Sequence, residues 1–272
     1  MGLEWLAQLY PGESHRPVLV EELPWPALRQ LIDQQDQLVL LPVGATEQHG
    51  PHLPVNTDTL IATAACHAAS ARTGVPVLPA ISYTVSLGHT EKWPGTFAIF
   101  HETLMSTVRE IARWALATGW SRLLIVNSHF GNDAALRCAV DRLRFDLDGQ
   151  FFVATRNTWS LTPEISAAFS QDAWDWHANE AETSLIQFVA PDLVRGDFAS
   201  ADDADRTSRC VFPHMVAHTS ENGVTGFPSQ ASAQRGSALL RKICDALADV
   251  IDRSRNERPP LPWSRNTGAF AA

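Results

Sequence analysis

Acidic and imidazole side chains crowd one short segment, residues 41–58, which reads LPVGATEQHGPHLPVNTD. In an extended chain, residues two apart point to the same side, so Glu47 and His49 can reach one centre while Gln48 faces away. Asp58 follows at a predicted helix start, where its carboxylate either caps the helix or binds a cation. Carboxylate oxygens and imidazole nitrogens together suit Zn²⁺, Mn²⁺ or Fe²⁺. The segment therefore predicts a site for a divalent metal ion.

Two further polar clusters follow later in the chain. The block NSHFGN carries His129, with Asn127 and Asn132 placed to brace a loop through side-chain to backbone hydrogen bonds. The block DWHANEAETS carries His177 and Glu182, whose spacing does not suit one helix face. We therefore expect His177 before a helix and Glu182 within its first turns, where a carboxylate can complete a metal shell while the histidine transfers protons.

Alternating strand and helix patterns position these clusters. Short apolar runs predict strands at 37–45, 75–83, 96–100, 122–127 and 150–155, and helical patterns occupy 56–74, 101–119, 133–147, 177–190 and 237–254. The order predicts a three-layer α/β fold, in which a largely parallel central sheet has helices on both faces. Sites in such sheets gather at the carboxyl ends of the strands, so the loops that carry His49 and His129 are expected to meet there.

Length and composition predict one well-filled domain. The chain has 272 residues, of which 45% are hydrophobic, with nine Trp and twelve Phe, and this composition excludes a disordered polymer. We expect a single domain over residues 1–272, with an extended C-terminal tail from about residue 256. The stretch 159–176 is irregular, and 196–210 is polar and predicted to be a surface loop.

Charge and cysteine usage exclude several classes of partner. A net charge of −9 without a cluster of Lys and Arg argues against nucleic acid. No apolar run approaches the roughly 18 to 20 residues of a membrane span, and the first residues lack the layout of a signal peptide. The four cysteines, Cys66, Cys138, Cys210 and Cys244, form no CxxC pair. We interpret them as reduced, mainly buried thiols of a cytoplasmic protein.

These blocks resemble the creatininase, or creatinine amidohydrolase, family. The resemblance lies in LPVGATEQHGPHLPVNTD, WPGT, NSHFGN, HANEAETS and GVTGFPSQASAQRG, which follow the order of the family between residues 41 and 236. It implies a creatininase-like α/β hydrolase that cleaves a carbon–nitrogen amide-type bond, other than a peptide bond, in a cyclic amide, a formamide or a related small molecule. It also implies a homo-oligomer, by analogy a hexamer.

The same resemblance assigns roles to residues. Family metal ligands correspond to Glu47, His49, Asp58, His129 and Glu182, with Asp58 bridging two divalent ions per subunit, for which Zn²⁺ is the expected metal and Mn²⁺ and Fe²⁺ are the alternatives. His177 matches the proton-transfer histidine, and we place Glu182 with it as a catalytic residue. A metal-bound hydroxide would attack the carbonyl carbon, and His177 would protonate the leaving nitrogen.

Departures from the family pattern concern the substrate. Ser128 and Phe130 stand at variable places of the NSHFGN block, and Gly131 stands where creatinine-hydrolysing enzymes have an acidic ligand. This argues against creatinine and suggests that Glu182 supplies the missing carboxylate. Aromatic residues predicted to contact substrate, with ordinary core and interface packing as the alternative, are Trp93, Phe130, Trp159, Trp174 and Trp176.

Rival functions remain at this level. A serine hydrolase using Ser128 lacks the GxSxG turn that such a nucleophile needs. A metal-binding but catalytically inactive scaffold protein would keep the same side chains. A family branch that acts on a small peptide would also keep them, so turnover and metal content must decide between these functions.

Overall fold

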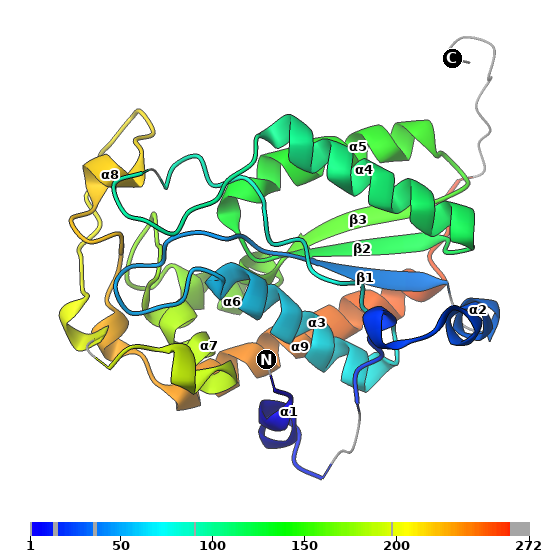
Figure 1. The fold of residues 1–272 in the computed structure, drawn as a ribbon, viewed down its shortest axis with the longest axis horizontal. Helices are drawn as coiled ribbons and strands as arrows, with labels where there is room; N and C mark the ends of the chain where they lie inside the picture. Colours follow the sequence, from blue (N-terminus) through cyan, green and yellow to red (C-terminus); the bar gives the residue numbers. More distant parts are fainter. Residues whose placement is uncertain (1, 13–15, 35–36, 90, 197, 262–272) are drawn as a thin grey trace.

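The computed structural model describes residues 2–12, 16–34, 37–89, 91–196 and 198–261. Within them, the central sheet has parallel strands in the order β1-β2-β3, at Leu38–Val43, Arg122–Asn127 and Phe152–Asn157 (Figure 1). The last residues of the three strands, Val43, Asn127 and Asn157, are aligned across the sheet. The loops that follow the strands therefore leave from the same edge.

Helices cover both faces of this sheet, as Figure 1 shows. One face carries α4 (His101–Thr118) and α5 (Asp133–Asp146). The other carries α3 (Thr57–Thr73) and α9 (Ala233–Arg255), and α7 (Glu180–Val189) packs against α9.

Side chains of β1 alternate between two hydrophobic cores. Leu38 and Leu40 belong to the core on the side of α3 and α9, whereas Val39, Leu41 and Val43 belong to the core on the side of α4 and α5. This alternation follows from the period of two along a strand. The predicted three-layer α/β fold with a parallel sheet is confirmed.

The predicted strand at 75–83 is wrong. Among the described residues, isolated bridges join this segment to β1 in place of a continuous ladder. Pro76 and Pro79 lack the N–H group that a regular ladder requires at each alternate position. Elsewhere the segment still follows β1, and the Ile81 N–H donates to the Pro42 carbonyl at 3.0 Å.

The predicted strand at 96–100 is also a loop. The Phe97 N–H donates to the Thr46 carbonyl at 3.0 Å, and the Gln48 N–H donates to the Thr96 hydroxyl at 3.1 Å. These hydrogen bonds hold the segment across the loop that follows β1. The WPGT block therefore supports the first polar cluster instead of extending the sheet.

Capping residues shift several helix boundaries from the predicted ones. The side chains of Asn179 and Ser232 cap α7 and α9, because each accepts a hydrogen bond from a backbone N–H group of the first turn. As a result, α7 begins three residues later than predicted, and α9 begins four residues earlier. The stretch expected to be irregular contains α6, which begins after the cap Thr162 with Pro163 at its first position. The remaining helices are α1 (Glu4–Leu9), α2 (Trp25–Gln34), α6 (Pro163–Phe169) and α8 (Val216–Thr219).

Other sequence predictions have mixed outcomes. Cys66 and Cys244 are buried, but Cys138 and Cys210 are exposed, so the interpretation of mainly buried thiols holds for only half of them. In the described part of the chain, no helix combines the length and apolar character needed to cross a membrane. Of the predicted C-terminal tail, residues 256–261 follow α9, and residues 262–272 lie outside the described part.

Candidate metal centre

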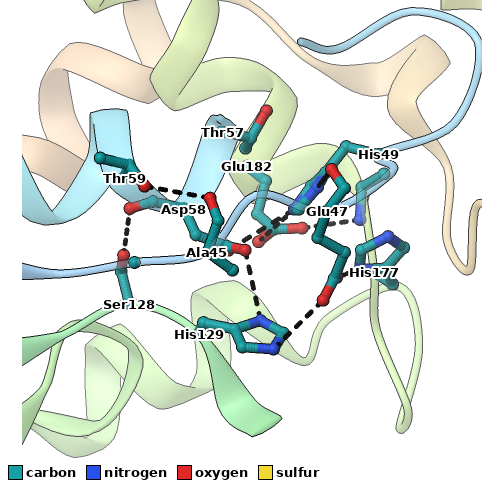
Figure 2. A network of polar contacts seen from close by, with 12 residues as sticks. Ala45, Glu47, His49, Thr57, Asp58, Thr59, Ser128, His129, His177 and Glu182 are labelled. Carbon is teal, nitrogen blue, oxygen red and sulfur yellow. Dashed lines mark hydrogen bonds and ion pairs between the residues drawn. The ribbon is translucent and has the colours of Figure 1, made fainter. Parts of the chain in front are cut away.

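Six acidic and imidazole side chains converge at the carboxyl edge of the sheet (Figure 2). They come from the loop after β1, the start of α3, the loop after β2 and the segment that enters α7. None of the six is more than 8% exposed. The six residues are Glu47, His49, Asp58, His129, His177 and Glu182, so all of the predicted ligands and the predicted proton-transfer histidine lie together.

His129 stands between two of the carboxylates. Its Nε2 is 3.1 Å from Glu47 Oε2, and its Nδ1 is 3.2 Å from Asp58 Oδ2. The loop is braced as predicted, because Asn127 Nδ2 donates to the His129 carbonyl at 2.9 Å and Asn132 Nδ2 donates to the Gly44 carbonyl at 2.9 Å. Glu47, Asp58 and His129 thus form one group of potential metal ligands.

His49 faces a second pair of carboxylates. Its Nε2 lies 3.5 Å from Asp58 Oδ1 and 3.8 Å from Glu182 Oε1, while its Nδ1 lies 3.1 Å from the main-chain carbonyl of Glu47. Asp58 therefore presents one oxygen to His49 and the other to His129. This is the placement that a carboxylate bridging two cations requires.

Asp58 does not cap its helix. It lies in the first turn of α3, one residue inside the helix, and the N-cap position belongs to Asn56. The hydroxyl of Ser128 donates to the main-chain carbonyl of Asp58 and joins the loop after β2 to the start of α3. Of the two roles that the sequence left open for Asp58, the geometry favours a cation ligand.

Glu182 reaches the centre from the first turn of α7, as predicted. Its Oε2 accepts a hydrogen bond of 2.6 Å from the Ala178 N–H, which leaves Oε1 facing His49. The adjacent Glu180 points elsewhere, because its Oε1 pairs with Arg235 Nε at 2.8 Å. One carboxylate of this block therefore serves the cluster, and the other ties α7 to α9.

His177 precedes α7 and is fixed by the GVTGFP block. Its backbone pairs with Thr225 through hydrogen bonds of 3.0 and 2.8 Å. Its ring Nε2 lies 2.8 Å from the Gln48 carbonyl, and its Nδ1 lies 3.4 Å from Glu47 Oε1. A fixed backbone and a fixed ring nitrogen thus direct Nδ1 at the carboxylates.

Sequence reasoning missed two residues of the site. His89 Nε2 lies 3.3 Å from Glu47 Oε1, and Gln48 Nε2 lies 3.0 Å from His89 Nδ1. The expectation that Gln48 faces away is wrong. Gln48 is only 3% exposed, and its side chain contacts both His89 and His177. The period of two fails here since the segment is a turning loop in which Gly50 has a φ of +66°. His89 has no other candidate ligand near it in the sequence, so its position shortly before the WPGT block was the only signal that could have indicated it.

Burial and charge set the protonation of the cluster. Burial raises the pKa of Glu47, although a charged His129 beside it counteracts this in part. Burial by itself would lower the pKa values of His49 and His129, but Asp58 and the other neighbouring carboxylates outweigh it and raise both. Burial of Asp58 is likewise outweighed by these histidines, which hold its pKa below the usual value. Three carboxylates in this space therefore require protons or cations to balance them.

The unpartnered atoms of the cluster test whether the residues fit metal ions. Among buried side-chain atoms, both oxygens of Glu47, Oδ2 of Asp58 and Nε2 of His49 form no hydrogen bond in the described part of the chain. Leaving such groups unsatisfied costs about 1 to 3 kcal/mol each, and more for charged groups. All are first-choice ligands of Zn²⁺ or Mn²⁺. The residues fit the metals.

Comparison with known proteins shows the family of this chain. The family model described as creatinine amidohydrolase matches residues 21–251. The chain belongs to the creatininase family. Among curated relatives of this creatininase-family chain, the creatinine amidohydrolase of Pseudomonas putida is 30% identical over 260 residues, which cover 90% of this chain and 99% of that protein. The mycofactocin precursor peptide peptidase of Mycolicibacterium smegmatis is 34% identical over 235 residues, which cover 82% of this chain and 88% of that protein.

Solved creatininase structures share the fold and include metal-containing forms. A crystal structure of creatinine amidohydrolase has a TM-score of 0.78 at 30% identity and covers 89% of this chain and 99% of its own. A mutant creatininase of the Zn-Zn type has a TM-score of 0.77, and a manganese form has 0.75, each at 29% identity. Metal use is thus a property of the creatininase family, and the cluster described above supplies potential ligands in this member.

The aromatic residues predicted for substrate binding separate into two sets. Phe130 and Trp176 flank Trp159, with ring centroids 5.9 and 6.2 Å from it, and Phe130 remains 70% exposed beside His129. Trp174 is 82% exposed, and the Trp93 ring lies 4.4 Å from Lys92 Nζ. The first set places the exposed Phe130 ring against Trp159, which belongs to the hydrophobic core together with the partly buried Trp176, so core packing holds for Trp159. No described contact links the second set to the cluster.

Metal binding to this creatininase-family chain is expected to release protons. Because the pKa values of Glu47, His49 and His129 are raised, these groups hold protons at neutral pH that cations must displace. We expect release of about one proton or more per chain at pH 7, and metal affinity that falls as the pH is lowered. Calorimetric titration of Zn²⁺ in buffers of different ionisation enthalpy measures this release. An observed enthalpy that does not depend on the buffer would contradict the prediction.

Proposed function

We propose that this chain is a metal-dependent amidohydrolase that cleaves a carbon–nitrogen amide-type bond in a small molecule. The observation that carries this proposal is the buried cluster of three carboxylates and three imidazoles, in which both oxygens of Glu47 lack a hydrogen-bond partner. Such a cluster is costly for folding unless cations bind it. Metal-dependent hydrolysis by this member of the creatininase family would account for that cost.

The cluster offers ligands for two divalent ions. Glu47, Asp58 and His129 would hold one ion, and His49 and Glu182 would hold the other with Asp58 as the bridge. Zn²⁺ is the expected metal, with Mn²⁺ and Fe²⁺ as alternatives, since all three accept these ligands. When bound, two such ions would lower the pKa of a water molecule and polarise the carbonyl group of the substrate.

His177 is the residue we assign to proton transfer. Its Nε2 lies 2.8 Å from the Gln48 carbonyl, which can only accept, so the ring proton is on Nε2 and the lone pair is on Nδ1. Nδ1 is directed at the carboxylates, 3.4 Å from Glu47 Oε1. His177 can therefore take a proton at Nδ1 from the attacking water and deliver it to the leaving nitrogen.

Glu182 occupies the role of a carboxylate that Gly131 cannot supply. A Cβ atom at Gly131 would lie 2.5 Å from the Val85 carbonyl oxygen and 2.6 Å from His129 Nε2, so any side chain there would displace His129. The nearby Glu182 Oε1 faces His49 instead. This difference supports a substrate other than creatinine, with Glu182 contributing negative charge to the metals and the reacting atoms.

The aromatic residues beside the cluster bear on the class of substrate. The exposed ring of Phe130, which packs on Trp159, suits a flat or apolar group beside the carboxylate cluster. A cyclic amide or formamide fits this surface. A short peptide is the second candidate, favoured by the 34% identity to the mycofactocin precursor peptide peptidase. Restriction to bonds other than peptide bonds therefore stays a prediction.

The test is hydrolysis by protein reconstituted in turn with Zn²⁺, Mn²⁺ and Fe²⁺. The substrates are creatinine, other cyclic amides, formamides and short peptides ending in aromatic residues. We expect turnover of at least one amide other than creatinine, lost on chelation and restored by metal. Stoichiometric metal without turnover of any substrate would instead favour the inactive scaffold.

The organisation of the protein around this site also stays a prediction. We propose one domain over residues 1–272, a cytoplasmic location and a homo-oligomer, a hexamer by family resemblance.

A further inference from the structure

His89 lies beside His177 and Glu47 and has no role in the reaction proposed above. Its ring centroid is 4.1 Å from that of His177, and its Nε2 is 3.3 Å from Glu47 Oε1. Its side chain is 13% exposed, whereas that of Glu47 is fully buried. His89 is therefore more accessible from solvent than Glu47.

The amide of Gln48 has a fixed orientation beside His89. Its Oε1 accepts a hydrogen bond of 2.9 Å from the Gly50 N–H, and its Nε2 donates to the Gly223 carbonyl at 3.1 Å. Exchanging the oxygen and nitrogen would place two donors and two acceptors against each other. The group that faces His89 Nδ1 at 3.0 Å is therefore the NH₂ of Gln48.

This contact fixes the tautomer of His89. Nδ1 accepts from Gln48 and so carries no proton, which places the ring proton on Nε2. In each of the other three histidines, one nitrogen faces a main-chain carbonyl, to which it donates, and the other nitrogen faces carboxylates. These outer contacts are 3.1 Å for His49, 2.7 Å for His129 and 2.8 Å for His177.

Glu47, His89 and His177 lie close enough to be potential metal ligands, but this tautomer makes His89 a donor and not a ligand. A neutral histidine that binds a metal through one nitrogen carries its proton on the other nitrogen and donates it in a hydrogen bond. Nδ1 of His89 cannot donate in this way, because it faces the NH₂ group of Gln48, which is itself a donor. Its Nε2–H is also not used by Glu47, because Oε1 of Glu47 accepts no hydrogen bond within the described residues. The N–H group is left for a molecule that enters the site.

We propose that His89 donates its Nε2–H to the carbonyl oxygen of the substrate, and that Gln48 is the positioning residue that holds the donating tautomer. The inference rests on the proposed amidohydrolase function. As the carbonyl carbon becomes tetrahedral, negative charge develops on this oxygen, so the hydrogen bond strengthens in the transition state. A neutral donor next to Glu47 adds this stabilisation without adding charge to the cluster.

The tautomer can be measured without any substrate. Long-range ¹H–¹⁵N spectra of Zn²⁺-loaded protein with ¹⁵N-labelled histidine distinguish a protonated Nε2 from a protonated or metal-bound nitrogen, and a His89→Gln sample assigns the signal. We expect His89 to be neutral with its proton on Nε2. A proton on Nδ1, or the signal of a metal-bound Nε2, would overturn the assignment.

Two variants of His89 test the role of the donor. Gln places an N–H₂ group near the position of Nε2, whereas Asn places one near Nδ1 and cannot reach the substrate. We expect His89→Gln to keep kcat within about tenfold of the wild type and His89→Asn to lose about 10²-fold to 10³-fold, with metal content unchanged in both. Equal activity of the two variants would contradict substrate donation by His89, and loss of metal in both would indicate a ligand.

The same measurements separate this inference from the proposed function. Suppose that the wild-type enzyme is active but His89 has the other tautomer, or that the His89 variants keep full activity. Either result would exclude the donor role of His89 and leave the proposed amidohydrolase function intact. Absence of turnover in the wild type would overturn the proposed function, and the donor role would fall with it even where the spectra show the Nε2–H tautomer.

Discussion

Replacing Asp58 with asparagine is expected to lower bound metal from about two ions per chain to one or none and to reduce kcat/KM by about 10³-fold, or about 4 kcal/mol of transition-state stabilisation. The carboxylate faces His49 at 3.5 Å and His129 at 3.2 Å, so it is the group shared by both halves of the cluster. Asparagine keeps the volume but removes the charge and one ligand oxygen. Both ions should therefore weaken together.

Metal analysis of protein purified without added metal, with amide hydrolysis measured on the same samples, checks this prediction. Asp249→Asn is the matched control, because Asp249 forms an exposed ion pair with Arg253 on α9, and such pairs contribute little to stability. Full metal content and full activity in the Asp58 variant would exclude a bridging role. Stoichiometric loss of metal in the control as well would show a general effect on folding.

Replacing His177 with alanine is expected to reduce kcat by about 10²-fold to 10⁴-fold while metal content is retained. Nδ1 of His177 faces Glu47 at 3.4 Å, but Glu47 already has Asp58 and His129 as partners for a metal. An amide nitrogen leaves poorly without a proton. The loss should therefore be large for amides and much smaller for an aryl ester, whose phenolate leaves without protonation.

Comparing kcat for the two kinds of substrate, with metal analysis alongside, separates the possible roles of His177. His214→Ala in an exposed loop is a suitable control, since it removes an imidazole outside the cluster. Equal losses on both kinds of substrate would argue against proton donation. Loss of about one metal ion would instead make His177 a ligand, for which its group with His49 and Glu182 provides the geometry.

The elements of the fold were largely predictable because their patterns are local. The strands at β1, β2 and β3 are short apolar runs, and α3 and α4 end at Gly74 and Gly119 in the left-handed conformation that glycine tolerates. The segment 75–83 was not predictable by the same means, because its residues are apolar like a strand but Pro76 and Pro79 interrupt the ladder.

The sequence by itself determined the family of this protein and the ligand types in each polar block, since these depend on residue identity and short spacings. Only the tertiary structure decided which nitrogen of each histidine faces the centre. For His89, His129 and His177 that choice depends on main-chain carbonyls and on the Gln48 amide, which come from other segments of the chain. The place of His89 in the site was likewise decided by tertiary structure. Its loop packs against the loop after β1, which brings His89 next to Glu47, and no local pattern indicates this contact.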